Sequence, residues 1–242
     1  MDKGYKNYLS WDELATLVKE GAYIGNHSYS HTHLIDRLSG EDTTGWKNRI
    51  REDIQRAQED IQKRLGVTPK LFSYPYGEFT TELQKLVSEL GLFGITQKSG
   101  ALDQDFDPLA VPRFPMAIPH DSLNRLIIAA NARPLPVMLI DASPRMLSEE
   151  ETATQRYEFS IHADGYRIDE LACYNSGDGT RLETSKTYHN NEIRVSMQLP
   201  AWSAGVRKIN CTAPSKREKN VFYWYSRLWI VYHSHKKPEQ PE

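Results

Sequence analysis

The chain has little excess charge, no long apolar run and few cysteines, and each of these features limits the partners or the location that we expect for it. It carries 30 Lys and Arg residues against 32 Asp and Glu residues over 242 positions, so its formal net charge is -2. A near-neutral chain gives no sign of a nucleic-acid or anionic-membrane partner. No segment approaches the about 20 apolar residues that a transmembrane helix needs. Residues 1–6 have no apolar core, so we expect no signal peptide there.

Only two cysteines occur, Cys173 and Cys211, and both fall in the second half of the chain. The count fits two buried free thiols, and it also fits a single disulfide in an exported protein. An intersheet disulfide would predict a periplasmic or secreted protein whose signal peptide is not in this chain. Free thiols, with Met1 as the true start, would predict the cytoplasm.

Residues 1–133 alternate helix and strand signals, which is typical of α/β architecture. Ser10 is the predicted N-cap of a helix through residue 18, with Glu13 in the capping-box position and Gly21 just past the end. A long amphipathic helix is predicted at 44–65, followed by Gly66. The remaining elements expected here are strands at 23–26, 71–74 and 93–96, helices at 81–90 and 121–131, and an extended segment at 110–116.

Helical periodicity almost disappears after residue 133, and short β-like runs separated by turn clusters replace it. We therefore expect a β-sandwich domain at 134–234 and a flexible polar tail at 235–242. The aromatic run at 221–230 favours a central strand packed on both faces over a sugar-binding face. The expected strands are 136–140, 155–161, 166–173, 192–199, 206–211 and 221–232.

Two histidines, His27 and His31, follow the predicted strand 23–26 at positions i and i+4. Both imidazoles would lie on one side if the segment turns into a helix, and they would then suit a divalent ion such as Zn²⁺. Among eight histidines such a pair also arises by chance. His33 would project differently. Ser28 either fixes a ring tautomer or caps a helix.

The segment Tyr74-Pro75-Tyr76-Gly77 forms a predicted turn after the strand 71–74. Proline fixes its own φ, and Gly77 permits a tight turn. The N–H of Tyr76 could then point into a cleft, as an oxyanion hole requires. The alternative is an ordinary turn that ends a strand.

The order of these segments resembles that of the polysaccharide deacetylases, carbohydrate esterase family four, over about residues 8–116. A strand ending in His-Ser-x-x-His, a long helix, a strand ending in x-Pro-Tyr-Gly and a helix–Gly–strand unit follow one another. The resemblance implies a distorted (β/α) barrel that removes acetyl groups from sugars with Zn²⁺ or another divalent transition metal. It makes His27 and His31 metal ligands. The Tyr76 amide becomes a catalytic group, and Pro75 and Tyr76 shape the substrate groove.

The chain departs from the family pattern in three places. Nothing before His27 matches the Thr-Phe-Asp-Asp-Gly-like motif that supplies the base and a third ligand, so we expect an N-terminally incomplete barrel. Phe72 or Ser73 stands where an Arg usually begins the Pro-Tyr motif. No clear Leu-x-His segment supplies a general acid, and His120 is either that acid or a surface residue. Arg113 lies where the family often has a catalytic Arg.

These observations predict metal-dependent hydrolysis of N-acetyl groups on an amino-sugar polysaccharide of the cell envelope. The absent Asp pair keeps a second hypothesis open, a catalytically inactive carbohydrate-binding or structural remnant. The expected partner is an N-acetylated polysaccharide or oligosaccharide. Missing barrel strands would leave an exposed sheet edge, which predicts self-association.

Overall fold

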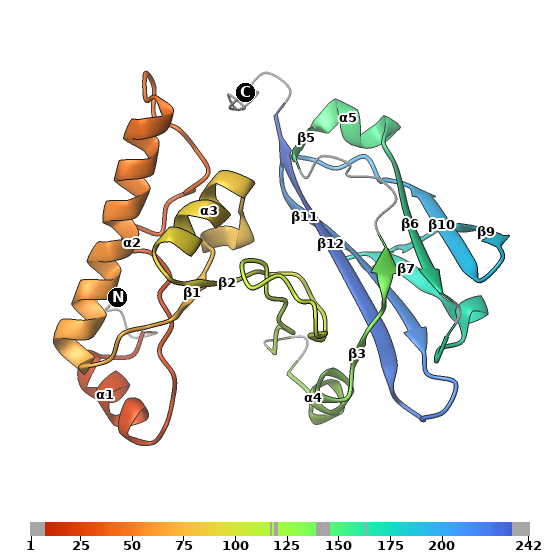
Figure 1. Cartoon of the computed structure of the whole chain (residues 1–242), viewed down its shortest axis with the longest axis horizontal. Helices are drawn as coiled ribbons and strands as arrows, with labels where there is room; N and C mark the ends of the chain where they lie inside the picture. Colours follow the sequence, from red (N-terminus) through yellow and green to blue (C-terminus); the bar gives the residue numbers. More distant parts are fainter. Residues whose placement is uncertain (1–7, 117, 119–120, 139–145, 163, 234–242) are drawn as a thin grey trace. The chain divides into compact units, whose positions relative to one another are not determined.

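The computed structural model describes residues 8–116, 118, 121–138, 146–162 and 164–233 (Figure 1). Its contacts divide the chain into two compact units. The first holds the residues up to Thr96 together with Asp107–Val111, and the second holds Gln97–Phe106 and the residues from Pro112 on. This division follows packing, and the domain boundary expected near residue 133 stays a prediction. His120 and the tail at 235–242 lie outside the described residues.

Three helices of the first unit have capping residues, of which Ser10, Glu13 and Gly66 were expected from the sequence. Helix α1 (Trp11–Lys19) begins after Ser10, whose hydroxyl and the Glu13 carboxylate complete a capping box. Helix α2 (Thr43–Leu65) has Asp42 as its N-cap. It ends at Gly66, whose φ of 69° lies in the left-handed region. Helix α3 (Thr81–Glu89) is capped by Thr80.

The sheet of the first unit is parallel and short. Strand β1 (Leu71–Ser73) pairs with β2 (Phe93–Ile95). Asn26 bridges to Phe72 on one side, and Ile95 bridges to Val111 on the other, both in parallel. The expected strand at 23–26 is therefore reduced to a single bridge. No closed barrel forms among the described residues, and the architecture is mixed α/β.

Gly94 in β2 marks the tightest approach in this sheet. A Cβ at this position would meet the Tyr74 hydroxyl and would lie 2.5 Å from the Leu109 carbonyl oxygen. The Tyr74 hydroxyl donates a hydrogen bond to that same oxygen at 2.9 Å. Only glycine leaves room for this contact between β2, Tyr74 and the 107–111 segment.

We expect Gly94→Ala to lower the free energy of unfolding of the first unit by about 1–3 kcal/mol, because an overpacked core must shift its neighbours. Denaturant unfolding measures the change. Gly25→Ala is the matched control, since its Cβ would meet nothing closer than 3.4 Å. Equal effects of the two substitutions would show that the contact at Gly94 is not tight.

The second unit is built mainly from strands. One sheet has the order β4-β6-β10-β9, and the other has the order β3-β12-β11-β7-β8, with β5 also pairing with β12. Residues of both sheets share one hydrophobic core, which includes Tyr157, Val195, Cys211 and Trp229. The expected sandwich fold stays a prediction. The bounds are α4 (Leu123–Ala130), β3 (Arg133–Pro134), β4 (Val137–Met138), β5 (Met146–Ser148), α5 (Glu149–Thr154), β6 (Arg156–His162), β7 (Ala172–Asn175), β8 (Arg181–Leu182), β9 (Ser185–His189), β10 (Glu192–Gln198), β11 (Gly205–Pro214) and β12 (Phe222–Tyr232).

One local expectation for this unit is wrong, and one helix was not expected from the sequence. The strand expected at 166–173 is a short 3₁₀ helix, Ile168–Glu170, followed by β7. Helix α5 was not expected, although Ser148 and Glu151 form a capping box at its start. The aromatic strand is an internal one, because β12 pairs with β11 on one side and with β3 and β5 on the other. Trp229 in this strand is fully buried.

Cys173 and Cys211 form a disulfide, which excludes the free-thiol alternative for this structure. They sit directly opposite each other on the neighbouring strands β7 and β11. The disulfide therefore joins two strands of one sheet, and the intersheet position expected from the sequence is wrong. Both side chains are fully buried. No helix among the described residues is long and apolar enough to cross a membrane.

Candidate active site

The two histidines meet at the carboxyl end of β1. The Nε2 atoms of His27 and His31 lie 3.2 Å apart. His27 Nδ1 lies 2.6 Å from the carbonyl oxygen of Ser73, the last residue of β1. Because a carbonyl can only accept, Nδ1 carries the proton and the ring lone pair is on Nε2. Both imidazoles thus present Nε2 to one point.

The segment that joins the histidines is not helical, so the helix expected to bring residues i and i+4 together is wrong. Ser28 and His31 have positive φ values of 65° and 54°. The Ser28 hydroxyl accepts a hydrogen bond from the His31 backbone N–H at 2.9 Å. Ser28 therefore stabilises a tight, non-helical turn of the backbone.

Asn26 anchors this turn to the rest of the unit. Its side chain is fully buried. Its Nδ2 donates hydrogen bonds to the carbonyl oxygen of Ile54 and to Gln58 Oε1, both at 3.0 Å. Its Oδ1 accepts the Ser28 N–H at 2.9 Å. This role of Asn26 was not expected from the sequence, although a polar residue at the end of an apolar run was a usable signal.

The histidine pair fits a divalent ion as a two-ligand site. Zn–N bonds of about 2.0–2.1 Å in a tetrahedral site place two ligand nitrogens about 3.3 Å apart, close to the observed 3.2 Å. The hydrogen bond to Ser73 is the outer contact that orients metal-binding histidines. Among the residues that the structure describes, no group of three or more His, Cys, Asp or Glu side chains could hold a metal.

The Tyr-Pro-Tyr-Gly turn lies beside the pair. Pro75–Gly77 form one turn of 3₁₀ helix, in which Tyr76 has a φ of 57°. The turn is closed by the N–H groups of Gly77 and Glu78, which donate to the carbonyls of Tyr74 and Pro75. Neither bond uses the Tyr76 N–H. Pro75 is buried, whereas Tyr76 is 41% exposed.

The Tyr76 side chain packs against the histidine pair through contacts with His31. Its hydroxyl donates to the carbonyl oxygen of His31 at 3.1 Å. Its ring meets the His31 imidazole edge-on, with centroids 4.8 Å apart. The structure thus brings three predicted site residues together: His27, His31 and Tyr76.

A third histidine, His33, packs on Tyr76 and is paired with the buried carboxylate of Glu78. The His33 ring stacks on Tyr76 with centroids 4.0 Å apart and an interplanar angle of 10°. His33 Nδ1 lies 2.8 Å from Glu78 Oε2. Glu78 is only 8% exposed, and burial raises its pKa, although the hydrogen bond with His33 opposes this shift. Glu78 was not expected at the site from the sequence.

The raised pKa of Glu78 predicts how its substitution should depend on pH. A raised folded-state pKa gives a contribution to stability that is present below the ordinary value of 4.5 and lost as pH rises through the folded value. Because Gln does not titrate, the unfolding free energy of Glu78→Gln relative to the wild type should increase as pH is raised through that window. Denaturant midpoints at a series of pH values measure this. Glu59→Gln, at an exposed position of α2, is the control, and a flat Glu78→Gln curve would contradict the prediction.

Arg113 belongs to the second unit, so its predicted catalytic role stays a prediction. Its backbone N–H donates to the Lys98 carbonyl oxygen at 2.8 Å. Burial lowers the pKa of Lys208, and the Arg113 charge contributes to the same shift. These contacts tie Arg113 to its own unit.

Comparisons with known proteins show what the first part of the chain is similar to. The family model described as "Polysaccharide deacetylase" matches residues 2–95. The uncharacterized protein YlxY of Bacillus subtilis is 36% identical over 73 residues, 30% of this chain and 20% of that protein. Peptidoglycan-N-acetylmuramic acid deacetylase PdaC of the same organism is 36% identical over 73 residues, 30% of this chain and 14% of that enzyme. The solved deacetylase domain of BpsB from Bordetella bronchiseptica aligns with a TM-score of 0.41 at 22% identity, covering 44% of this chain and 48% of that domain.

The match thus spans a fifth or less of the length of these two curated relatives. The family model covers the region from α1 to β2, which includes the histidine pair and the Tyr76 turn. Residues 2–95 are thus polysaccharide deacetylase-like.

Proposed function

We propose that the first unit catalyses the metal-dependent hydrolysis of N-acetyl groups on an amino-sugar polysaccharide. The observation that carries the proposal is the pair of Nε2 atoms 3.2 Å apart, held by Ser73 and flanked by Tyr76. A relative with 36% identity over 73 residues is named as a peptidoglycan-N-acetylmuramic acid deacetylase. The hydrolysis adds water across the amide bond and releases acetate and a free amine.

Each residue of the site has a distinct part in this proposal. His27 and His31 hold Zn²⁺ or another divalent transition metal through Nε2, with His27 kept in the required tautomer by Ser73. A bound divalent ion would polarise the acetyl carbonyl and lower the pKa of a water molecule. The Tyr76 N–H, which closes no hydrogen bond of its turn, donates to the oxyanion that forms on the carbonyl oxygen. Pro75 begins the turn and restricts its backbone, and Tyr76 forms a wall of the sugar groove.

A second candidate is a catalytically inactive carbohydrate-binding protein. It is favoured by one observation: the described residues offer two histidines but no third His, Cys, Asp or Glu in the same group. A catalytic zinc site normally has about three protein ligands. The two candidates make opposite predictions about turnover and the same prediction about sugar binding.

Acetate release from N-acetylglucosamine oligomers, assayed on the full chain with added Zn²⁺ or Co²⁺, tests the proposal. We expect release by the wild type and a loss of at least about 100-fold in His27→Ala. This is the usual order of effect when a group that stabilises the transition state is removed. His189→Ala, at an exposed position of the second unit, is the matched control and should retain full activity. Release that is absent, or equal in the wild type and His27→Ala, would favour the inactive candidate.

The disulfide supports a location in an oxidising compartment, and we place the protein in the periplasm or outside the cell. Self-association through a sheet edge stays a prediction. So does the assignment of Arg113 as a catalytic residue.

A further inference from the structure

The turn that carries Tyr76 has a backbone conformation that its own sequence does not favour. Tyr76 has a φ of 57°, in the left-handed region, which is unfavourable for most residues other than glycine. Such a conformation persists only where the surrounding structure holds it, and it is found mostly at functional sites. The contacts that hold Tyr76 therefore decide in which direction its backbone N–H points.

The face of the Tyr76 ring rests on His33. The two hydrogen bonds that close the turn join backbone groups, and the ring itself is 41% exposed, so neither the turn nor the core fixes it. The Tyr76 hydroxyl donates to the carbonyl oxygen of His31 at 3.1 Å, which holds the tip of the side chain. The His33 imidazole stacks on the ring with centroids 4.0 Å apart and an interplanar angle of 10°. This stack is the contact that sets the plane of the ring.

Glu78 sets the orientation of His33 in turn. Its Oε2 lies 2.8 Å from His33 Nδ1, and because an ionised carboxylate only accepts, Nδ1 is the donor. The His33 side chain is 49% exposed, whereas that of Glu78 is 10% exposed. A half-exposed ring is free to rotate unless a hydrogen bond stops it, and bonds to an ionised group are among the stronger ones. The buried carboxylate therefore holds the exposed ring.

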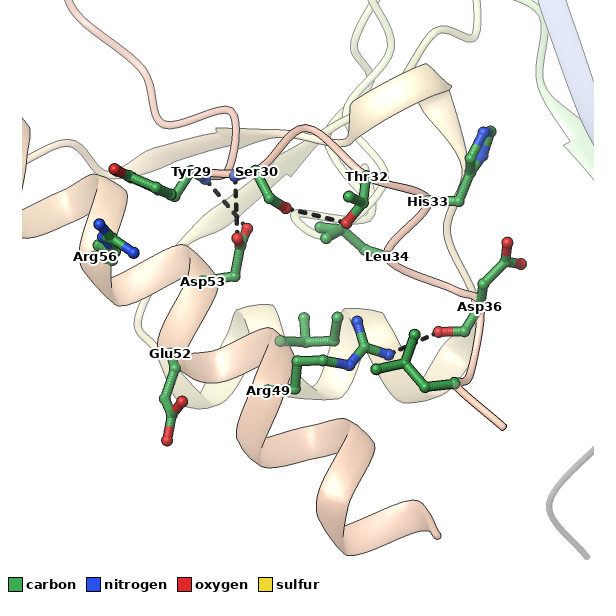
Figure 2. A pocket seen from close by; sticks show the side chains of 12 residues that line it. Tyr29, Ser30, Thr32, His33, Leu34, Asp36, Arg49, Glu52, Asp53 and Arg56 are labelled. Carbon is green, nitrogen blue, oxygen red and sulfur yellow. Dashed lines mark hydrogen bonds between the residues drawn. The ribbon is translucent and has the colours of Figure 1, made fainter. Parts of the chain in front are cut away.

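The backbone that carries His33 is fixed on both sides by helix α2. The two carboxylate oxygens of Asp53 accept the N–H groups of residues 29–30 at 3.1 and 3.0 Å (Figure 2). Further along the loop, Arg49 donates to the Asp36 carbonyl oxygen at 2.9 Å. Figure 2 shows His33 on the stretch of loop between these two anchors. His33 thus projects from a backbone that is already ordered.

A carboxylate at the position of Glu78 is costly for the fold. Burial raises its pKa, which means that its charged form is disfavoured there. Among the described residues, its ion-pair partner is the half-exposed His33. An apolar side chain of similar volume would fill the space without this cost. A group that is unfavourable for stability and lies close to a proposed reaction centre is a candidate for function.

We propose that Glu78 is a positioning residue of the proposed reaction centre: it orients His33, and His33 holds the Tyr76 ring, so that the strained turn keeps the Tyr76 N–H in one direction. The use of that N–H for an oxyanion rests on the proposed function. Removing Glu78 should weaken an interaction made only in the transition state, which lowers kcat and leaves KM unchanged. Zinc affinity should not change, because His27 and His31 keep their own contacts.

Acetate release from N-acetylglucosamine oligomers by the full chain with added Zn²⁺ measures the effect on the reaction. We expect Glu78→Ala to lower kcat at least about tenfold, short of the roughly 100-fold or more that loss of an oxyanion donor costs, with KM within a factor of about two. Glu78→Gln should recover most of this loss, because its Oε1 still accepts the His33 N–H. Glu59→Ala, at an exposed position of α2, is the matched control and should behave like the wild type. Zinc stoichiometry counts the folded sites in each sample, so a smaller folded fraction is not mistaken for a lower kcat.

Hydrogen exchange of the metal-free full chain gives a second readout that does not need activity. The Gly77 N–H, bonded to the Tyr74 carbonyl oxygen at 3.0 Å, reports on the turn. The Tyr74 N–H, bonded to the Ile95 carbonyl oxygen at 3.1 Å, reports on the sheet. In Glu78→Ala we expect exchange at Gly77 to accelerate at least about tenfold while exchange at Tyr74 stays unchanged, because only the turn is loosened. Glu78→Gln should exchange like the wild type at both amides.

The two readouts separate this inference from the proposed function. If the wild type releases no acetate, the proposed function fails and exchange decides. Acceleration at Gly77 alone, reversed in Glu78→Gln, then supports the positioning role, whereas no acceleration, or equal acceleration at Gly77 and Tyr74, overturns it. If acetate is released, an unchanged kcat in Glu78→Ala, or a loss confined to KM, overturns the role and leaves the activity intact. A Glu78→Gln variant no better than Glu78→Ala would overturn the link through His33.

Discussion

Replacing His31 with alanine should weaken zinc binding to the full chain by at least about 100-fold. The reason is the small number of ligands. The Nε2 atoms of His27 and His31 lie 3.2 Å apart, and no third His, Cys, Asp or Glu of the described residues joins them in a group that could hold a metal. Loss of an outer contact to a metal ligand already costs about 10–100-fold in affinity, so loss of one of two direct ligands should cost more. Calorimetry with Zn²⁺ on the wild type and the variant measures the effect.

His33→Ala is the matched control for this experiment. It lies two residues further along the same loop, but its Nδ1 faces Glu78 and its ring stacks on Tyr76. It should therefore leave zinc affinity within a factor of about two. Tight, stoichiometric zinc binding that survives His31→Ala, or that is lost in His33→Ala, would mean that the ligands are wrongly assigned.

Acid should also release the metal from the wild type. Imidazole ligates only when neutral, so protons compete with the metal for the ring nitrogens. Zinc affinity should consequently fall as pH is lowered. The same titration series, repeated at several pH values, records this.

The sequence alone predicts the helices of the first unit well, because their ends depend on local chemistry. Ser10 and Glu13 lie three residues apart and satisfy each other's backbone groups, which needs no tertiary partner. Gly66 ends α2 by adopting a left-handed conformation that other residues avoid. The apolar repeat of α2 becomes a buried stripe that includes Ile50, Ile54 and Ile61.

The geometry of the site could not be predicted from spacing. His27 and His31 meet because Ser28 and His31 adopt positive φ values in a non-helical turn, which a helical interpretation of the i, i+4 spacing misses. The turn holds because Asn26, fully buried, bonds to α2, a contact between residues about thirty positions apart. The pairing of His33 with Glu78 spans a still longer separation. Such contacts depend on how the chain folds back, and no local pattern encodes them.

The second unit shows the same limit for strands. The segment 166–173 has the composition of a strand, but Ile168–Glu170 form a 3₁₀ turn, and Lys186 Nζ donates to the Ile168 carbonyl oxygen at 2.8 Å. The strand begins only at Ala172, which places Cys173 opposite Cys211. The disulfide was one of two alternatives that the cysteine count left open, whereas the position of both cysteines within one sheet depended on strand order. Strand order is a tertiary property.

Removal of the Cys173–Cys211 disulfide should lower the unfolding free energy of the second unit by about 2–4 kcal/mol. The bond closes a loop with a sequence separation of 38, which restricts the unfolded chain. Both cysteines belong to the core shared by the two sheets. The variant with Cys173→Ala and Cys211→Ala, unfolded in denaturant beside the wild type, measures the loss. Added reductant should destabilise the wild type and leave the double variant unchanged, which separates the effect of the bond from that of repacking.

The oxidation state of Cys173 and Cys211 in the natural protein tests the proposed cellular compartment. Disulfides form and persist in oxidising compartments, whereas most cytoplasms keep cysteine thiols reduced. Thiol titration of the natural protein, denatured without reductant, should therefore find no free thiol. Two free thiols would remove the support for a periplasmic or secreted location, and the second unit would then have to fold without its crosslink. A wild-type protein that unfolds identically with and without reductant would lead to the same conclusion, because the bond would then contribute nothing to the fold.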